Sequence, residues 1–291
     1  HEIARRHRVP AEQVVPLPVG VANHVVALGE RLVVRIPRGP EYEADLRKES
    51  ALLPVVHGAG VSTPALVEHV DPPEGIPHML VERLPGTDLA DREPEPGALV
   101  RLGRELARIH RIPAASLPEL PHDDGAQNDH TPLVERLHQL GHIDTEAARW
   151  LHTWCEQLAG ELPEVVVPTL VHGDLAPQNL LVSSDGTLTG IVDWGDAALA
   201  DPATDFVKLP PWWLSPVLEG YRKELGEGID HPWEARVLWH HLIWALGRLE
   251  NPEPRPGARH WTAPPTSRLL GLLRLFGSLH PDPWTVRVPR P

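Results

Sequence analysis

The stretch from Val171 to Val182, VHGDLAPQNLLV, places three polar side chains between two aliphatic runs. His172, Asp174 and Asn179 interrupt a segment that is otherwise apolar. A buried polar group without a partner costs about 2–7 kcal/mol, so a chain keeps such groups only when the fold satisfies them or when they do chemistry. This stretch constrains the fold more than any other, because the surrounding structure must supply a partner for each group.

A second polar segment, GIVDWGD, places Asp193 fourteen residues after Asn179. The runs NLLV and GIV are typical of two short strands, and the residues between them, SDG at 184–186, are typical of a tight turn. We therefore expect a hairpin that returns Asp193 to the side of Asn179.

The spacing of these residues indicates phosphoryl-transfer chemistry. The pattern H-x-D-x-x-x-x-N, from His172 to Asn179, is that of a protein-kinase catalytic loop, and DWG at 193–195 matches D-F-G with Trp for Phe. Such transfer needs one oxygen to orient and deprotonate a hydroxyl, and others to hold Mg²⁺ on the phosphates. Asp174, Asn179 and Asp193 would supply these oxygens in the right order, whereas His172 is interpreted as a structural hydrogen-bonding residue.

The first part of the chain is rich in strand patterns. Residues 14–38 contain three β-branched runs separated by turn residues, and ALVEHV and HMLVERL add two more, so we expect an antiparallel sheet. Between these runs, a predicted helix that ends at Gly58 carries Glu49 on the same face as Leu46 and Leu53. A charged side chain on an apolar face needs a partner.

Helical periodicity dominates after Pro85-Gly86. It is clearest in three segments, 97–111, 145–160 and 233–249. With 291 residues, 41% of them hydrophobic, the chain is long enough for two lobes. We place the lobes at 1–85 and 86–291.

The charge is unevenly distributed. The net charge is −13, of which residues 1–85 contribute −2 (9 basic, 11 acidic) and the remainder −11 (18 basic, 29 acidic). An acidic surface argues against binding to nucleic acid or to an anionic membrane. It is compatible with a cationic ligand, and equally with a surface that only keeps the protein soluble.

Location and redox state follow from simpler features. No apolar run approaches the roughly 18 residues that span a membrane, and the first residues, HEIARRHRVP, lack the apolar block of a secretory signal. We expect a soluble, cytoplasmic protein. The single Cys155 excludes an intramolecular disulfide and a multi-cysteine zinc site.

The segments LVHGDLAPQNLLV, GIVDWGDAALADPATDF and ELARIH resemble the aminoglycoside phosphotransferases and related small-molecule kinases, the macrolide kinases among them. The resemblance implies a two-lobed α+β fold like that of protein kinases, with a small antiparallel-sheet N-lobe and a mainly helical C-lobe. It also implies that Asp174 is the catalytic base and that Asn179 and Asp193 are Mg²⁺ ligands. Asp201 and Asp205 would be structural acids that brace the loop.

The same resemblance implies a nucleotide site in the N-lobe. Where kinases have a strand lysine, LVVRIPR offers Arg35, which we pair with Glu49. The glycine-rich loop is degenerate in PVGVANHVV, and Asn23 is the candidate phosphate contact there. The base of ATP or GTP would meet backbone groups near Glu82 and Leu84.

The predicted reaction moves the γ-phosphoryl group of ATP or GTP, with Mg²⁺, to a hydroxyl of a small molecule, and the acidic second lobe favours a cationic one. An aminoglycoside is the first candidate and a macrolide the second. Two alternatives stay open: a metabolic kinase for a sugar, choline or homoserine, and a nucleotide-binding pseudokinase, which Arg35 and the poor glycine loop would favour. The sequence does not indicate an oligomeric state.

Other conspicuous residues have plainer interpretations. His240 and His241 lack the spacing of a zinc helix and are expected to be ordinary helix residues. The Trp212-Trp213 pair is expected to pack in the core. The acidic loop HDDGAQND is interpreted as solvated, with a role in gripping an amine-rich ligand as the alternative; its acids are Asp123, Asp124 and Asp129.

Overall fold

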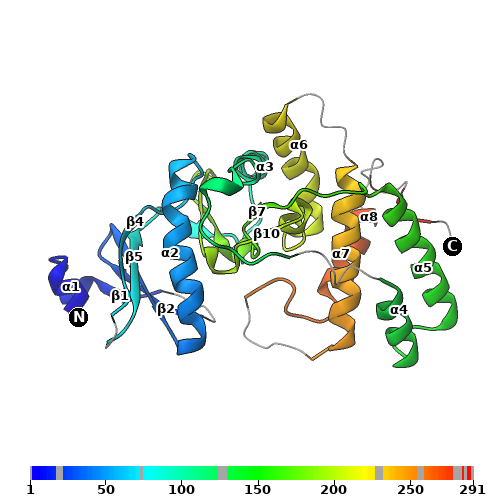
Figure 1. The fold of residues 1–291 in the computed structure, drawn as a ribbon, viewed down its shortest axis with the longest axis horizontal. Helices are drawn as coiled ribbons and strands as arrows, with labels where there is room; N and C mark the ends of the chain where they lie inside the picture. Colours follow the sequence, from blue (N-terminus) through cyan, green and yellow to red (C-terminus); the bar gives the residue numbers. More distant parts are fainter. Residues whose placement is uncertain are drawn as a thin grey trace.

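A five-stranded antiparallel sheet forms one end of the molecule, and helices form the other (Figure 1). The strand order is β1-β2-β3-β5-β4. The strands are β1 (Val14–Pro16), β2 (Asn23–Leu28), β3 (Leu32–Pro37), β4 (Leu66–Val70) and β5 (His78–Glu82). This computed structural model describes residues 2–17, 22–72, 75–123, 130–226, 232–253, 259–277, 284 and 287–289. The strands predicted from the β-branched runs are confirmed.

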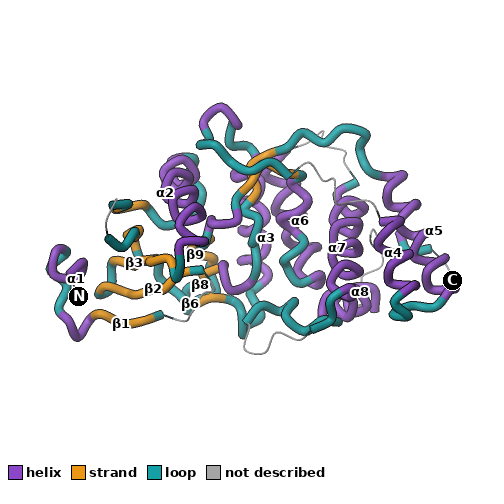
Figure 2. Tube along the Cα trace, turned by 60° about the horizontal axis from the view of Figure 1, so that its bottom comes forward, coloured by secondary structure: helices purple, strands orange, loops and turns teal. Residues whose placement is uncertain are grey.

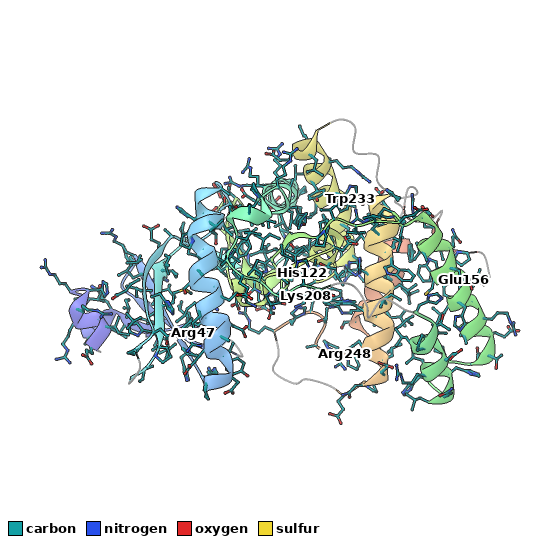
Figure 3. All side chains as sticks on the ribbon, in the orientation of Figure 1. Arg47, His122, Glu156, Lys208, Trp233 and Arg248 are labelled. Carbon is teal, nitrogen blue, oxygen red and sulfur yellow. The ribbon has the colours of Figure 1, made fainter. Side chains whose placement is uncertain are left out.

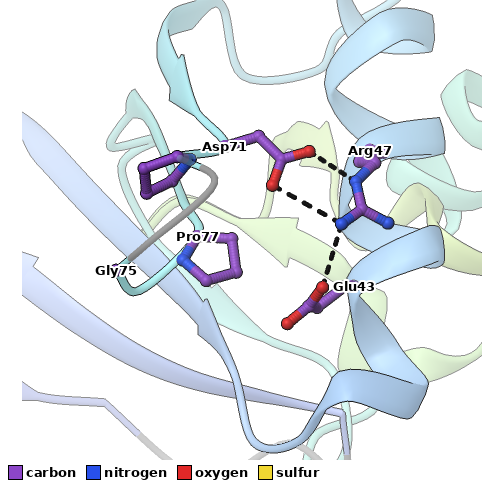
Figure 4. Close-up of a pocket in the computed structure, with 6 residues that line it drawn as sticks. Glu43, Arg47, Asp71, Gly75 and Pro77 are labelled. Atoms are coloured by element: carbon purple, nitrogen blue, oxygen red, sulfur yellow. Dashed lines mark hydrogen bonds and ion pairs between the residues drawn. The ribbon is translucent and has the colours of Figure 1, made fainter.

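Helix α2 (Glu43–Gly58) covers one face of the sheet, and the short α1 (Glu2–Arg6) lies on the other side (Figure 1). As its periodicity predicts, α2 buries an apolar stripe that includes Leu46 and Leu53, and Glu49 is buried on the same helix. The guanidinium of Arg47 bridges Glu43 and Asp71, the residue after β4, and so ties α2 to the sheet (Figure 4).

The predicted hairpin lies between the sheet and the helices (Figure 2). Its strands β8 (Leu180–Val182) and β9 (Leu188–Ile191) pair antiparallel, and β6 (Thr87–Asp88) adds to the β8 edge. Just before and after it, β7 (Thr169–Val171) pairs with β10 (Ala198–Ala200). Within the turn, Asp185 accepts a hydrogen bond from the Thr187 amide, and Gly186 has a φ of 81°.

The helical end confirms the three predicted helices within one or two residues. Its helices are α3 (Pro96–His110), α4 (His130–Gln139), α5 (Thr145–Glu161), α6 (Leu214–Leu225), α7 (Trp233–Glu250) and α8 (Ser267–Gly277). The short 3₁₀ helices are η1 (Ala11–Gln13), η2 (Pro40–Tyr42), η3 (Ala114–Ser116), η5 (Pro177–Asn179), η6 (Trp194–Asp196), η7 (Pro202–Phe206) and η8 (Pro211–Trp213).

The predicted fold class, a two-lobed α+β architecture with a small antiparallel sheet and a mainly helical remainder, is confirmed. The division of the chain at residue 85 stays a prediction. Among the residues that the structure describes, no helix combines the length and the apolar character that crossing a bilayer requires.

Helices α3 and α6 approach each other at two glycines. A Cβ at Gly103 of α3 would lie 1.9 Å from the Val217 carbonyl oxygen, and one at Gly220 of α6 would lie 1.9 Å from the Val100 carbonyl oxygen. These are backbone atoms, so a side chain at either position would have to push the helices apart. The close approach places α6 directly against α3, whose last residue, His110, contacts Tyr221 of α6 and Asp205.

Substitution of Gly103 by Ala should therefore destabilise the protein although alanine favours helices. Separating the helices should cost about 1–3 kcal/mol, as overpacking does, and outweigh the gain of about 1 kcal/mol in helix propensity. Urea denaturation followed by circular dichroism measures the difference. The matched control is Gly247→Ala in α7, where a Cβ would meet nothing within 4 Å, so that variant should be as stable as the parent or more stable. Equal stabilities for the two variants would contradict the close approach.

Candidate functional site

Asp174 lies in the loop between β7 and β8, with both carboxylate oxygens engaged. Asn179 Nδ2 donates to Oδ2 at 2.9 Å, and Lys208 Nζ donates to Oδ1 at 2.7 Å. Asn179 Nδ2 also donates to the Asp174 carbonyl oxygen at 2.8 Å. The Asp174 side chain keeps 21% of its surface exposed, so an incoming molecule can still reach it.

Asp205 holds the start of this loop. Its carboxylate accepts the backbone amides of His172 and Gly173, each at 2.9 Å, and contacts His110 Nε2 at 3.1 Å. Burial opposes ionisation of this group, but the contact with His110 and the amides outweighs burial and lowers the pKa of Asp205. His172 is fully buried and its Nε2 contacts the Val192 carbonyl oxygen at 3.1 Å, as expected of a structural residue.

Asp193 follows β9 and adopts a left-handed backbone conformation with a φ of 72°. Non-glycine residues rarely adopt this conformation, and those that do are concentrated at functional sites. Arg35 of β3 donates from Nη2 to Asp193 Oδ1 and from Nη1 to Glu49 Oε1, the latter at 2.6 Å. The structure therefore brings the predicted pair together and adds Asp193 to it.

The pKa values of the two carboxylates that share Arg35 shift in opposite directions. Burial raises the pKa of Glu49 to about 7, although the Arg35 guanidinium opposes the shift. Burial also acts against ionisation of Asp193, but there Arg35 prevails and lowers the pKa. Asp193 therefore keeps the negative charge that a cation would bind.

Trp194, which stands where kinases have Phe, packs in the core and joins the two parts of the site. Its amide donates to Glu49 Oε1 at 3.1 Å, and its indole Nε1 donates to Thr63 Oγ1 at 2.9 Å. Its ring lies 4.6 Å from that of His172, between centroids. Through Trp194 the loop that carries Asp174 rests on α2 of the opposite lobe.

Asn179 and Asp193 each have a side-chain oxygen that is not used in the hydrogen bonds described above, and these oxygens suit Mg²⁺. Asn179 uses Nδ2 in its hydrogen bonds, which leaves Oδ1, and Asp193 has a second oxygen beside the one bound to Arg35. The described residues contain no group of three His, Cys, Asp or Glu side chains that could hold a metal alone. Mg²⁺ in phosphoryl-transfer sites typically takes one or two protein carboxylates and completes its shell with phosphates and water, so the residues present fit it.

The other residues predicted to contact the nucleotide lie at or just beyond the ends of strands in the first sheet. Asn23 begins β2, is buried, and its Oδ1 has no hydrogen-bond partner among the described residues. Glu82 ends β5 and donates its amide to the Ala65 carbonyl oxygen, so a nucleotide base could use only the carbonyl of Glu82. Leu84 lies against Gly190 of β9. Their roles stay predictions.

Asp201 does not brace the loop, contrary to the sequence-based expectation. Its carboxylate contacts Arg236 and His240, so it ties the start of η7 to α7. His240 and His241 are buried helix residues with structural partners, as expected. Asp123 donates its amide to Leu199 O. The other acids of that loop, Asp124 and Asp129, lie outside the described residues.

Sequence reasoning missed two residues beside Asp174. Lys208 makes the ion pair described above, and His260 Nε2 lies 3.9 Å from Asp174 Oδ1. No spacing rule connects positions 174, 208 and 260. The signal that the sequence offers is that Lys208 follows Asp205 by three residues, just beyond the end of the segment GIVDWGDAALADPATDF.

Trp213 is buried as predicted, and Trp212 is partly buried against the same core, with Arg274 over its ring. A surface hollow of about 450 Å³ lies beside α2 (Figure 4). Its lining includes none of the predicted site residues, and its charged groups, Glu43, Arg47 and Asp71, are already paired with one another.

The fold and the loop geometry define a kinase-like phosphotransferase. The chain belongs to the phosphotransferase enzyme family, whose sequence profile matches residues 13–239. The resemblance carried by the three quoted segments is thereby confirmed.

Individual relatives agree with this assignment. An aminoglycoside 2′-phosphotransferase of type IIIa, a mutant solved with GDP, is 25% identical, with a TM-score of 0.64 over 85% of this chain and 86% of that one. The macrolide 2′-phosphotransferase of Brachybacterium faecium is 20% identical, with a TM-score of 0.62 over 97% of each chain. An uncharacterized Bacillus subtilis protein, YcbJ, is 31% identical over 126 residues, and the chain spans only 39% of that relative's length.

Asp201 yields a test of the network behind the site. Burial alone would raise its pKa, but His240 and Arg236 lower it to about 2. A lowered carboxylate pKa stabilises the fold above the unfolded-state value near 4, and this contribution is lost as the pH falls toward 2. Asp201→Asn should therefore cost about 2 kcal/mol at pH 7, and the difference should shrink below about pH 4. Denaturant titrations of the parent and of Asp201→Asn from pH 7 to pH 3 measure the difference in unfolding free energy. A difference that does not vary with pH would refute the lowered pKa of Asp201.

Proposed function

We propose that this protein transfers the γ-phosphoryl group of ATP or GTP to a hydroxyl of a small molecule. The observation that carries the proposal is that Asn179 and Asp193 flank the open end of the hairpin, where the Val192 amide donates to the Asn179 carbonyl oxygen. Asn179 binds Asp174 there, and Arg35 binds Asp193. These groups match the parts that phosphoryl transfer requires, namely a base, metal ligands and a cation on the phosphates. The family to which the chain belongs supports the same reaction class.

In this proposal Asp174 accepts a hydrogen bond from the acceptor hydroxyl and takes its proton as the oxygen attacks the γ-phosphorus. The bond from the γ-phosphorus to the β–γ bridging oxygen breaks, and the nucleoside diphosphate leaves with that oxygen. Each carboxylate oxygen has two lone pairs, so the hydrogen bonds from Asn179 and Lys208 leave room for a further donor. The protein makes no covalent bond. Catalysis then comes mainly from positioning and from charge stabilisation in a site whose geometry is already formed.

Asn179 and Asp193 would hold Mg²⁺ through the oxygen atoms that their hydrogen bonds leave over. When bound, the ion would screen the negative charge of the phosphates and fix their orientation. Arg35 would hold Asp193 in place and add positive charge on the nucleotide side, as the strand lysine of kinases does.

The nucleotide would lie between the lobes, which we propose to divide at residue 85. The lobe of residues 1–85 would bind it through Arg35 and Asn23, with the base near Glu82 and Leu84. One solved relative contains GDP, so both ATP and GTP are candidate donors. Both nucleotides are abundant in the cytoplasm, where we propose that the protein works.

The proposed acceptor is an antibiotic hydroxyl, on an aminoglycoside first and on a macrolide second. Two observations support this order: the solved relatives include an aminoglycoside and a macrolide phosphotransferase, and the net charge of −13 favours a cationic acceptor. Metabolic alcohols such as sugars, choline and homoserine are the competing acceptors.

The test is nucleotide consumption with Mg²⁺ across aminoglycosides, macrolides, amino alcohols and sugars, with ATP and with GTP. Turnover on one class of compound is expected, and Asp174→Asn should reduce it by about 10²–10⁴-fold, as loss of a general base does. Nucleotide binding without turnover on any acceptor would favour the pseudokinase alternative. Turnover confined to a sugar or an amino alcohol would replace the antibiotic.

Loss of a metal ligand has a different signature from loss of the base. Asp193→Asn should raise the Mg²⁺ concentration for half-maximal activity by at least about tenfold. The reason is that a neutral amide replaces the carboxylate of Asp193, one of the two proposed protein ligands. Chelation with EDTA should abolish activity. Asp196→Asn is the matched control, since Asp196 is exposed and only three residues away, and it should behave as the parent does. An unchanged Mg²⁺ requirement in Asp193→Asn would exclude Asp193 as a ligand.

A further inference from the structure

Lys208 reaches the proposed base from a distant part of the chain. Its ammonium lies 2.7 Å from Asp174 Oδ1, although 34 residues separate the two in sequence. Both side chains are about one-fifth exposed, so the ion pair is only partly screened by water. Figure 3 shows Lys208 near the middle of the molecule, between α2 and α7.

The backbone that carries Lys208 is held at three successive carbonyl groups. Each of them accepts a hydrogen bond from a side chain in the C-terminal part of the chain. The pairs are Phe206 O with His241 Nε2 at 3.1 Å, Val207 O with Arg268 Nη1 at 2.8 Å, and Lys208 O with Trp261 Nε1 at 2.6 Å. The donors come from α7, from α8 and from the segment between them. Three separate parts of the chain therefore hold the backbone from which the Lys208 side chain extends.

These contacts persist across the physiological pH range. Burial lowers the pKa of His241 to about 3, so its ring stays neutral and donates from Nε2 to the Phe206 carbonyl oxygen. Burial also lowers the pKa of Arg268, to about 10, which leaves it charged. Its guanidinium lies over the rings of Trp244 and Trp261. The Lys208 ammonium lies 5.8 Å from the Trp244 ring centroid.

A second group approaches the same oxygen of Asp174. The amide of Thr262 donates to His260 Nδ1 at 3.1 Å, and because an amide can only donate, Nδ1 must be the acceptor nitrogen. The neutral ring therefore carries its proton on Nε2, which lies 3.9 Å from Asp174 Oδ1. His260 is next to Trp261, which holds the Lys208 carbonyl, so one short segment supports both groups.

We propose that Lys208 is a positioning residue for the transfer reaction, which holds the Asp174 carboxylate in one orientation from the side opposite Asn179. The inference rests on the proposed function, because it assigns a role around the same base. With Oδ2 bound by Asn179 and Oδ1 bound by Lys208, rotation of the carboxylate would break one or both hydrogen bonds, so its remaining lone pairs keep a fixed direction.

The expected effect of Lys208 on the rate comes from its restricted position beside Asp174, and not from the strength of the ion pair alone. A flexible surface pair contributes about 0–1 kcal/mol, because ordering two long side chains offsets the attraction. Here the three carbonyl contacts already restrict the lysine, so less freedom is lost. A misplacement of about 1 Å at a reacting group can cost about 10²-fold in rate. Lys208 therefore matters more for the rate than for the stability of the fold.

Kinetics of Lys208→Met, with the acceptor identified by the panel above, provide the first test. We expect kcat to fall by about 10–10²-fold, with KM for nucleotide and acceptor within about twofold, because in this proposal Lys208 acts through Asp174 and not on either substrate. Lys223→Met is the matched control: Lys223 is exposed on α6, and the variant should keep the parental kcat.

A double-mutant cycle separates action through Asp174 from direct contact with phosphate. In the Asp174→Asn background, Lys208→Met should cause no further loss, since the group that it positions is already gone. An equal loss in both backgrounds would overturn the proposal in favour of a phosphate contact. A higher kcat in Lys208→Met would overturn it in favour of an inhibitory pair that must open.

Chemical restoration tests whether the ammonium itself is responsible. Lys208→Cys should be as slow as Lys208→Met, and treatment with 2-bromoethylamine, which adds an aminoethyl group to the thiol, should restore most of kcat. Alkylation with iodoacetamide, which adds a neutral group, should not. The native Cys155 will not interfere, because it is fully buried and burial raises its pKa to about 12.

The outcomes also separate this inference from the proposed function. Absence of turnover by the parent on every acceptor would remove the proposed function and this role with it. Turnover by the parent that Asp174→Asn abolishes and Lys208→Met leaves unchanged would refute the role of Lys208 alone.

Discussion

The buried guanidinium of Arg35 is the interaction on which the rest of the site depends. It bonds Glu49 of α2 and Asp193 after β9, and so joins the sheet, its covering helix and the metal-binding segment at one point. A buried charge that loses its partner costs several kcal/mol, so these three segments can form only together. The pairing explains how Asp193 is kept in a left-handed conformation that few residues adopt.

A second network, around Asp205, orients the loop that carries Asp174, and Trp194 connects the two. Asp205 accepts the amides at the start of the loop, while Trp194 packs on His172 and donates to Glu49. The proposed base and the proposed metal ligand thus depend on separate polar groups that share one aromatic contact. This arrangement keeps both carboxylates in place without a direct bond between them.

Much of the fold could be predicted because its signals are local. The hairpin between Asn179 and Asp193 follows from two aliphatic runs and a turn, and α2 follows from a helical stripe with Glu49 on its apolar face. Arg35 and Glu49 could be paired because kinases pair a strand lysine with a helix glutamate, and Glu49 stood on an apolar face where it needed a partner. Asp201 was misjudged because its partners, Arg236 and His240, lie on a helix that no motif connects to it.

The sequence by itself determined the reaction class, since the spacing of His172, Asp174, Asn179 and Asp193 sets their order along the chain and the hairpin that brings them together. Only the tertiary structure decided what surrounds the base. Lys208 and His260 reach Asp174 from elements far away in sequence. The physical reason is that short-range spacing controls backbone geometry within one turn or hairpin, whereas contacts between distant side chains arise from how helices and loops pack, which no local pattern encodes.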